Sequence, residues 1–186
     1  MGHTQLRKYE EYAYVLEYKS RIKSTTVRGR TGTIIVAIGE ERLTLLEILG
    51  IEGSTFDVGE RIYIGKEGRT KVESVLGKMD YTKISDPAKN EIPRVVTLIV
   101  TQNEKKFVDY INNAQPLTPR VHSLELIPGI GKTYLDVIIK EREKSLFENF
   151  NDIEKRAGLK EPINHLSQRI IEEISGETRM NLFVKR

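Results

Sequence analysis

Residues 124–142 read LELIPGIGKTYLDVIIKER, and the interpretation of the C-terminal part of the chain begins with them. A short apolar segment meets residues 128–132, here named the PGIGK turn, and apolar residues then recur at helical spacing. Gly129 and Gly131 can adopt positive φ values, and neither brings a side chain that would hold a ligand away. The stretch therefore predicts two short helices joined by a tight, exposed turn.

The PGIGK turn has residues suited to holding a phosphate. The backbone N–H groups of Gly129, Ile130 and Gly131 would precede the second helix, whose N-terminus carries unpaired donors and partial positive charge. Lys132 adds a flexible cation at the same point. Such a site contacts the nucleic-acid backbone and does not read the bases. A plain connector between helices, or a surface for a protein partner, is the alternative.

The segment resembles the helix-hairpin-helix (HhH) family of nucleic-acid-binding motifs, whose hairpin is an apolar residue followed by Pro-Gly-Ile-Gly. Residues 147–153 and 157–159 are similar to the linker and third helix of tandem members. The resemblance places a second hairpin near residues 158–162, which read GLKEP and lack Gly-x-Gly. That second unit is therefore expected to be structural. Leu135 stands where the family often has Ala, which implies a slightly different helix spacing.

The first hundred residues show a different periodicity. Apolar residues there alternate mostly with a period of two, and glycine-rich turns interrupt them. The pattern predicts strands at residues 12–18, 33–38, 43–49, 61–64, 69–76 and 95–100. Five or six short strands at this spacing are typical of a small closed barrel of the OB type, with a sandwich as the alternative.

After Thr101 the period becomes 3.6, and Pro116 and Pro119 then mark a boundary. We therefore expect an α+β protein with two domains. The first is an OB-like β-barrel with a terminal helix over residues 1–115, and the second is an all-α helix-hairpin-helix domain over residues 116–186.

A barrel of this kind binds single strands on an open face, through basic residues and stacking aromatics. No acidic residue occurs between Tyr18 and Gly39, although five basic residues do. The candidate residues on the barrel face are Arg28, Arg30, Tyr63, Lys66, Arg69 and Lys71. For these candidate binding residues there are simpler structural roles: Tyr63 could pack within the protein, and Arg28 and Arg30 could lie in a solvated loop.

Over its whole length the chain is similar to an uncharacterised archaeal family predicted to bind RNA. Its members join an OB-like N-terminal domain to a C-terminal HhH domain. The alternating pattern of residues 10–100 and the PGIGK turn carry this similarity. The resemblance implies a non-catalytic nucleic-acid-binding protein, with RNA favoured over DNA. A protein-docking assembly module and a DNA repair or recombination accessory protein are the alternatives.

Composition excludes several classes of protein. The 30 basic and 27 acidic residues give a net charge of only +3, so net charge alone does not indicate nucleic-acid binding. The absence of Cys excludes disulfides, thiolate metal sites and a Cys nucleophile. The GKT triplet at 131–133 lacks the earlier glycine of a P-loop. We expect no enzyme activity, no cofactor and no metal.

The sequence also indicates the compartment. No run approaches the roughly 18 apolar residues of a membrane span. Residues 1–8 lack the apolar centre of a leader peptide. We therefore expect a cytoplasmic protein without a membrane partner.

Overall fold

The computed structural model describes residues 10–186, which form two compact units. The sheet unit contains the residues up to Val95 together with 174–176 and 183–186, and the helical unit contains 96–173 and 177–182. Helix α1 (Asp86–Gln102) belongs to both units. The boundary predicted between residues 115 and 116 separates two domains that would each fold on their own. The compact units do not show which segments fold on their own, so this boundary stays a prediction. Residues 1–8, which bear on a leader peptide, lie outside the described part.

The sheet unit is built on five antiparallel strands in the order β4-β1-β2-β3-β5. β-Branched residues dominate the central strand, residues 31–39, as expected for a strand that is buried on both faces over most of its length. The strands are β1 (Tyr12–Lys23), β2 (Thr31–Gly39), β3 (Leu45–Gly50), β4 (Arg61–Tyr63) and β5 (Val72–Lys78).

The sheet curls into a half-barrel and does not close. Among residues 10–186, β4 pairs only with β1 and β5 pairs only with β3. The carbonyls of Ile64 and Gly65, just beyond β4, accept hydrogen bonds from the Arg69 guanidinium at 3.0 and 2.6 Å. Because these two carbonyls already accept from Arg69, they are not free to form the strand hydrogen bonds that a longer β4 would need.

The fold class expected from the sequence is therefore wrong in two respects. The OB-like barrel is not closed, because β4 ends after three residues. The helices are also not confined to a separate C-terminal domain, because the sheet unit takes in the first half of α1 and two C-terminal segments. What remains is an α+β protein with a half-barrel sheet.

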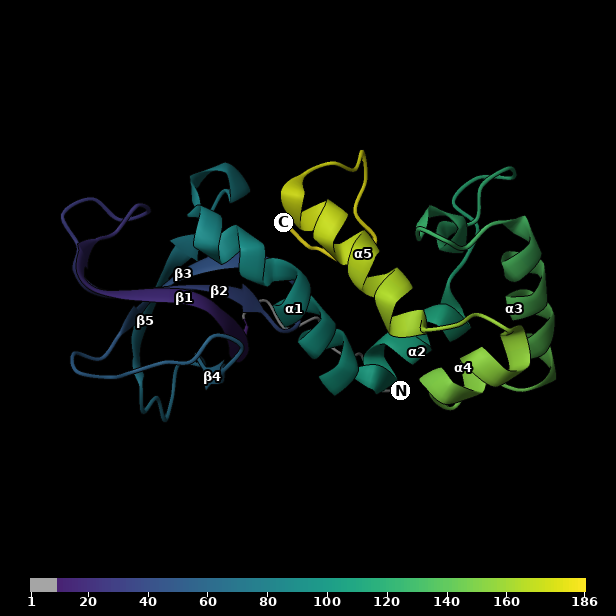
Figure 1. The fold of residues 1–186 in the computed structure, drawn as a ribbon, viewed down its shortest axis with the longest axis horizontal. Coiled ribbons are helices and arrows are strands. Elements are labelled where there is room, and N and C mark those ends of the chain that lie inside the picture. The colour runs from purple at the N-terminus through teal and green to yellow at the C-terminus, as the bar shows by residue number, and fades with distance from the viewer. Residues whose placement is uncertain (1–9) are drawn as a thin grey trace. The chain divides into compact units, whose positions relative to one another are not determined.

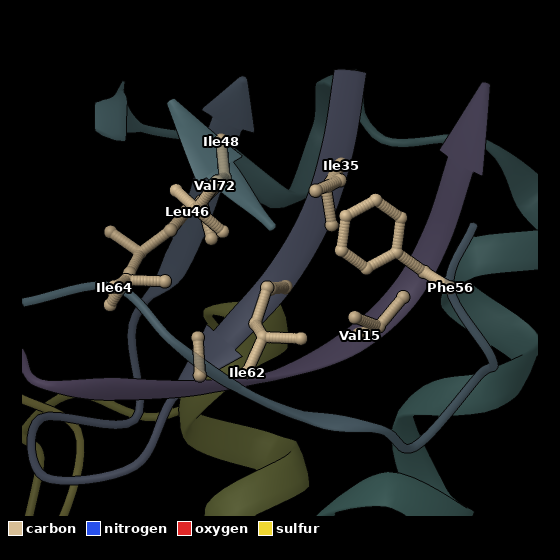
Figure 2. Close-up of a cluster of buried hydrophobic side chains, with 10 residues drawn as sticks. Val15, Ile35, Leu46, Ile48, Phe56, Ile62, Ile64 and Val72 are labelled. Atoms are coloured by element: carbon tan, nitrogen blue, oxygen red, sulfur yellow. The ribbon is translucent and has the colours of Figure 1, made fainter. Parts of the chain in front are cut away.

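The concave core of the sheet unit is a cluster of aliphatic side chains and one Phe, drawn in Figure 2. Its members alternate along β1, β2 and β3, as the period-two pattern predicts. Phe56 closes the cluster, and the Tyr18 ring packs edge-on against it with centroids 5.4 Å apart.

Residues 95–100 are helical, so the strand predicted there is wrong. Ile92, Val95, Val96, Ile99 and Val100 recur at helical spacing and are all at most 2% exposed. The run of β-branched residues favours a strand locally, but the buried helical face outweighs that propensity. Ser85, immediately before the helix, donates to Glu17 on β1 at 2.7 Å, which holds the first half of α1 to the sheet.

The helical unit continues from the second half of α1. Asn149 caps α4 by accepting from the Asp152 N–H at 2.7 Å, and Gly158 ends that helix in the left-handed conformation that glycine adopts readily. The elements are α2 (Glu104–Asn113), the 3-10 helix η2 (Ser123–Leu126), α3 (Lys132–Lys144), α4 (Phe150–Ala157) and α5 (Pro162–Ser175). The α-helices are labelled in Figure 1.

Candidate functional site

The PGIGK turn joins η2 to α3 and is anchored by its own isoleucine. The Ile130 side chain is 3% exposed, and its N–H donates to the Ile127 carbonyl at 3.1 Å. Gly129 has a φ of +87°, a conformation that an L-residue adopts at a cost. The turn is therefore a defined structure with Ile130 inside and both glycines exposed.

The exposed side of the turn presents unsatisfied donors. Within residues 10–186, the N–H groups of Gly129, Gly131 and Lys132 donate to no acceptor. Gly131 is the N-cap of α3 and offers no capping side chain, so the first amides of that helix stay open. The exposed Lys132 adds a cation there. Of the three amides expected to face a ligand, the Ile130 N–H is already used within the turn.

Helix α5 fixes the backbone on the other side of the turn. His165 Nδ1 lies 2.8 Å from the Pro128 carbonyl oxygen, which can only accept, so Nδ1 carries the proton. The ring edge of His165 also lies directly against Gly129, where a Cβ would collide with it. One helical turn later, Arg169 donates to the Leu126 carbonyl at 3.1 Å. Neither contact could be predicted from the sequence, since both depend on tertiary structure.

A buried ion pair supports that brace. Arg169 donates to Glu173 at 2.8 Å and to the Met180 carbonyl at 2.7 Å. The same Glu173 carboxylate accepts from the Leu182 N–H at 2.9 Å. Breaking such a pair leaves a buried charge without compensation. The position of the turn thus depends on the C-terminal half of α5.

Two further exposed side chains, Tyr134 and Asp136, lie close to the turn in the sequence. Tyr134 is 38% exposed only two residues after Lys132, and it was not among the site residues predicted from the sequence. Its signal was an aromatic in the first turn of a helix that follows a glycine-rich turn. The exposed Asp136 follows Lys132 by four residues, on the same helix face, and lowers the local positive potential.

In the sheet unit, several of the expected basic residues already have protein partners. Arg69 donates to three backbone carbonyls, those of Ile64, Gly65 and Glu73, at 2.6 to 3.0 Å. Lys71 pairs with Glu60 at 2.6 Å, and Arg30 pairs with the exposed Glu73 at 3.3 Å. Arg30 and Arg69 therefore both contact Glu73, but the hydrogen bonds of Arg69 hold the segment between β4 and β5 in place.

Tyr63 is half-buried and stacks within the protein. Its ring packs edge-on against Tyr12, with the centroids 5.4 Å apart. The Arg61 guanidinium covers the Tyr12 ring at 3.5 Å and makes a bidentate pair with the buried Glu40. The hydrogen bonds to Glu40 raise the pKa of Arg61 above its ordinary value. Lys66 and Arg28 are both exposed.

Glu47 is a buried carboxylate that was likewise not among the residues predicted from the sequence. It is 1% exposed on β3, and it accepts hydrogen bonds from Ser24, Thr25 and Thr26 in the loop between β1 and β2. Burial alone would raise the pKa of Glu47, but these hydrogen bonds outweigh burial and the pKa is lowered. The carboxylate therefore fixes the loop that carries Arg28 and Arg30.

The part of the chain that the structure describes holds no group of three or more His, Asp or Glu side chains that could bind a metal ion. None of its helices has both the length and the apolar character needed to cross a membrane.

Residues 9–185 match a family described as "Protein of unknown function (DUF655)". The "Uncharacterized protein MJ0038" of Methanocaldococcus jannaschii is 36% identical over 181 residues, which is 96% of this chain and 82% of that protein. The crystal structure of Af1531 from Archaeoglobus fulgidus is 38% identical with a TM-score of 0.81, covering 95% of this chain and all of that one. The expected similarity to an uncharacterised archaeal family is confirmed.

Proposed function

This chain belongs to the DUF655 family, and on that premise we propose that it is a non-catalytic nucleic-acid-binding protein whose preferred ligand is RNA. The proposed contact is the PGIGK turn, acting as a helix-hairpin-helix phosphate site. The Gly129 and Gly131 amides and the Lys132 ammonium would hold one backbone phosphate, with the open N-terminus of α3 behind them.

The observation that carries this proposal is the combination of open donors and a braced backbone. The Gly129 and Gly131 amides have no acceptor within residues 10–186, and the carbonyls of Pro128 and Leu126 are held by His165 and Arg169. A connector needs no such brace from a third helix. Donors fixed before the ligand arrives lose less freedom on binding, which favours affinity. The preference for RNA rests on the family resemblance, because amides that hold a phosphate do not sense the 2′-hydroxyl.

The test uses a substitution that the fold accommodates. A Cβ at Gly131 would meet no atom within 4 Å, and Asp is a better N-cap than Gly. Gly131→Asp should therefore fold at least as stably as the wild type while placing a carboxylate where the phosphate would bind. Gly131→Asn is the matched control, since it has the same shape and capping capacity without the charge.

Fluorescence anisotropy with labelled single-stranded RNA, single-stranded DNA and duplex DNA measures the effect at low and moderate salt. We expect G131D to weaken RNA binding by about tenfold or more, roughly one charge-assisted hydrogen bond, and G131N to bind much more tightly than G131D. Equal binding by both variants, or no binding by the wild type, would count against the phosphate site and favour protein docking. Tighter binding to duplex DNA would favour the DNA accessory role.

A further inference from the structure

The hairpin that joins β1 to β2 is a surface of concentrated positive charge. Residues 19–30, here named the basic hairpin, carry five basic residues, and no Asp or Glu occurs from residue 19 to residue 38. The rest of the chain is close to neutral, with acidic residues spread through it. We propose that the basic hairpin is a second contact for the phosphate backbone of single-stranded RNA, an inference that rests on the proposed function.

Within the part of the chain that the structure describes, three of the five cations form no ion pair. Arg21, Lys23 and Arg28 are exposed, and within the described residues 10–186 none of them forms an ion pair. Lys19 and Arg30 differ, because they pair with Glu17 at 3.6 Å and Glu73 at 3.3 Å. Cations that serve the fold of this unit have partners, as Arg69 does. The unpaired three are therefore available to a polyanion.

The backbone of the basic hairpin supports the same conclusion. Arg21 has a φ of +56° at an irregularity in the pairing of β1 with β2, between Lys19 and Ile22. An L-residue in this left-handed region is strained, and such strain persists where the surrounding structure fixes it. A glycine would relieve it, yet the position holds an arginine. A bulge of this kind re-aims a side chain, here that of a cation.

The loop of the basic hairpin is also held in place before any ligand arrives. Glu47 on β3 accepts from Thr25 Oγ1 and Thr26 Oγ1, both at 2.7 Å. The Ser24 N–H donates to the Arg30 carbonyl at 2.7 Å, which closes the loop. Figure 1 shows this loop extending from the end of β1. A loop that is already ordered loses little conformational freedom when its cations bind phosphates.

The composition of the basic hairpin also indicates how it would bind. It has no aromatic residue, so it cannot stack on bases, and it offers positive charge, hydroxyl groups and aliphatic side chains. Ile22 and Val27 are 36% and 38% exposed. We therefore expect contacts that do not depend on sequence and that weaken steeply with salt.

The test compares two triple variants with equal charge change. R21Q/K23Q/R28Q removes the three unpaired cations, and K78Q/K83Q/K185Q removes three exposed lysines elsewhere in the same unit. For single strands, each phosphate contact contributes about 0.7 to the slope of log affinity against log salt. The hairpin variant should therefore show a slope about 2 units shallower than that of the wild type, while the control keeps the wild-type slope. Circular dichroism checks that both variants are folded.

The outcomes separate this inference from the proposed function. A shallower salt slope for R21Q/K23Q/R28Q than for K78Q/K83Q/K185Q, together with loss of binding in G131D, supports both the inference and the proposed function. Equal slopes for the two triple variants overturn the inference and leave the PGIGK turn as the only contact tested. Loss of binding to anionic phosphatidylserine vesicles in R21Q/K23Q/R28Q, with RNA binding unchanged, also overturns it. No RNA binding by the wild type overturns both.

Discussion

Replacement of Glu47 by Gln should destabilise the sheet unit and release the loop of the basic hairpin. One carboxylate oxygen accepts from the Thr25 N–H at 3.0 Å, and the other accepts from the Thr26 N–H at 3.3 Å. In E47Q, the new amide NH₂ must face one of these backbone donors, whichever way it is oriented. A hydroxyl can rotate away from a donor, but a backbone N–H cannot.

The magnitude follows from the hydrogen bonds that are lost. A hydrogen bond to a buried charge contributes about 1.5–3 kcal/mol, and E47Q removes at least one and weakens the others. We therefore expect the free energy of unfolding to fall by about 2–4 kcal/mol at pH 7. Urea denaturation measures it, and amide hydrogen exchange over residues 24–30 should become faster. E73Q is the control, since Glu73 makes only an exposed pair with Arg30 and should change stability by less than about 1 kcal/mol.

The effect should depend on pH in a defined direction. The pKa of Glu47 is lowered in the folded protein, so the charged carboxylate stabilises the fold at every pH above the ordinary pKa of an exposed glutamate. As the pH falls below that value and through the lower folded pKa, the wild type loses this stabilisation and E47Q does not. The stability difference should therefore narrow in acid. A difference at pH 7 no larger than that of E73Q, or one that does not change with pH, would refute the reasoning.

Two further predictions separate structural roles from binding roles. Gly129→Ala should lower the free energy of unfolding by about 1–3 kcal/mol, because φ is +87° and the new Cβ meets the His165 ring, whereas Gly131→Ala should cost less than about 1 kcal/mol. Thermal unfolding compares the two, and equal losses would contradict the geometry. R69K keeps the charge but loses the three-carbonyl clamp, so it should destabilise the protein by about 1–3 kcal/mol while leaving the salt slope of RNA binding unchanged. A stable R69K with a shallower slope would instead make Arg69 a phosphate contact.

The local elements could be predicted from the sequence where periodicity and turn chemistry agree. The alternation in β1, the continuous apolar run in β2, the stop at Gly158 and the tight turn before α3 all follow from residues adjacent in the chain. The strand predicted at residues 95–100 was wrong because a run of β-branched residues also fits one face of a helix. Only the partner surface decides between the two, and a single sequence does not contain that surface.

The candidate site could likewise be predicted only where its residues are adjacent in the chain. The PGIGK turn was found because its chemistry is contiguous. The role of Arg69 was missed because the carbonyls that it binds are set by where β4 ends. Glu47 did leave a signal, a single acid within the apolar run 45–49. Its partners, however, lie more than 20 residues earlier in the chain, and no local pattern connects the two.

The assignment of residues 183–186 to the sheet unit has a consequence for synthesis of the chain. Phe183 and Val184 are 7% and 6% exposed, and the Lys185 N–H donates to the Arg42 carbonyl at 2.9 Å. During translation, the strands leave the ribosome long before these residues do. The half-barrel therefore stays incomplete, with the surface around Arg42 uncovered, until almost all of this sequence has been made. The first unit to be synthesised is for this reason completed last.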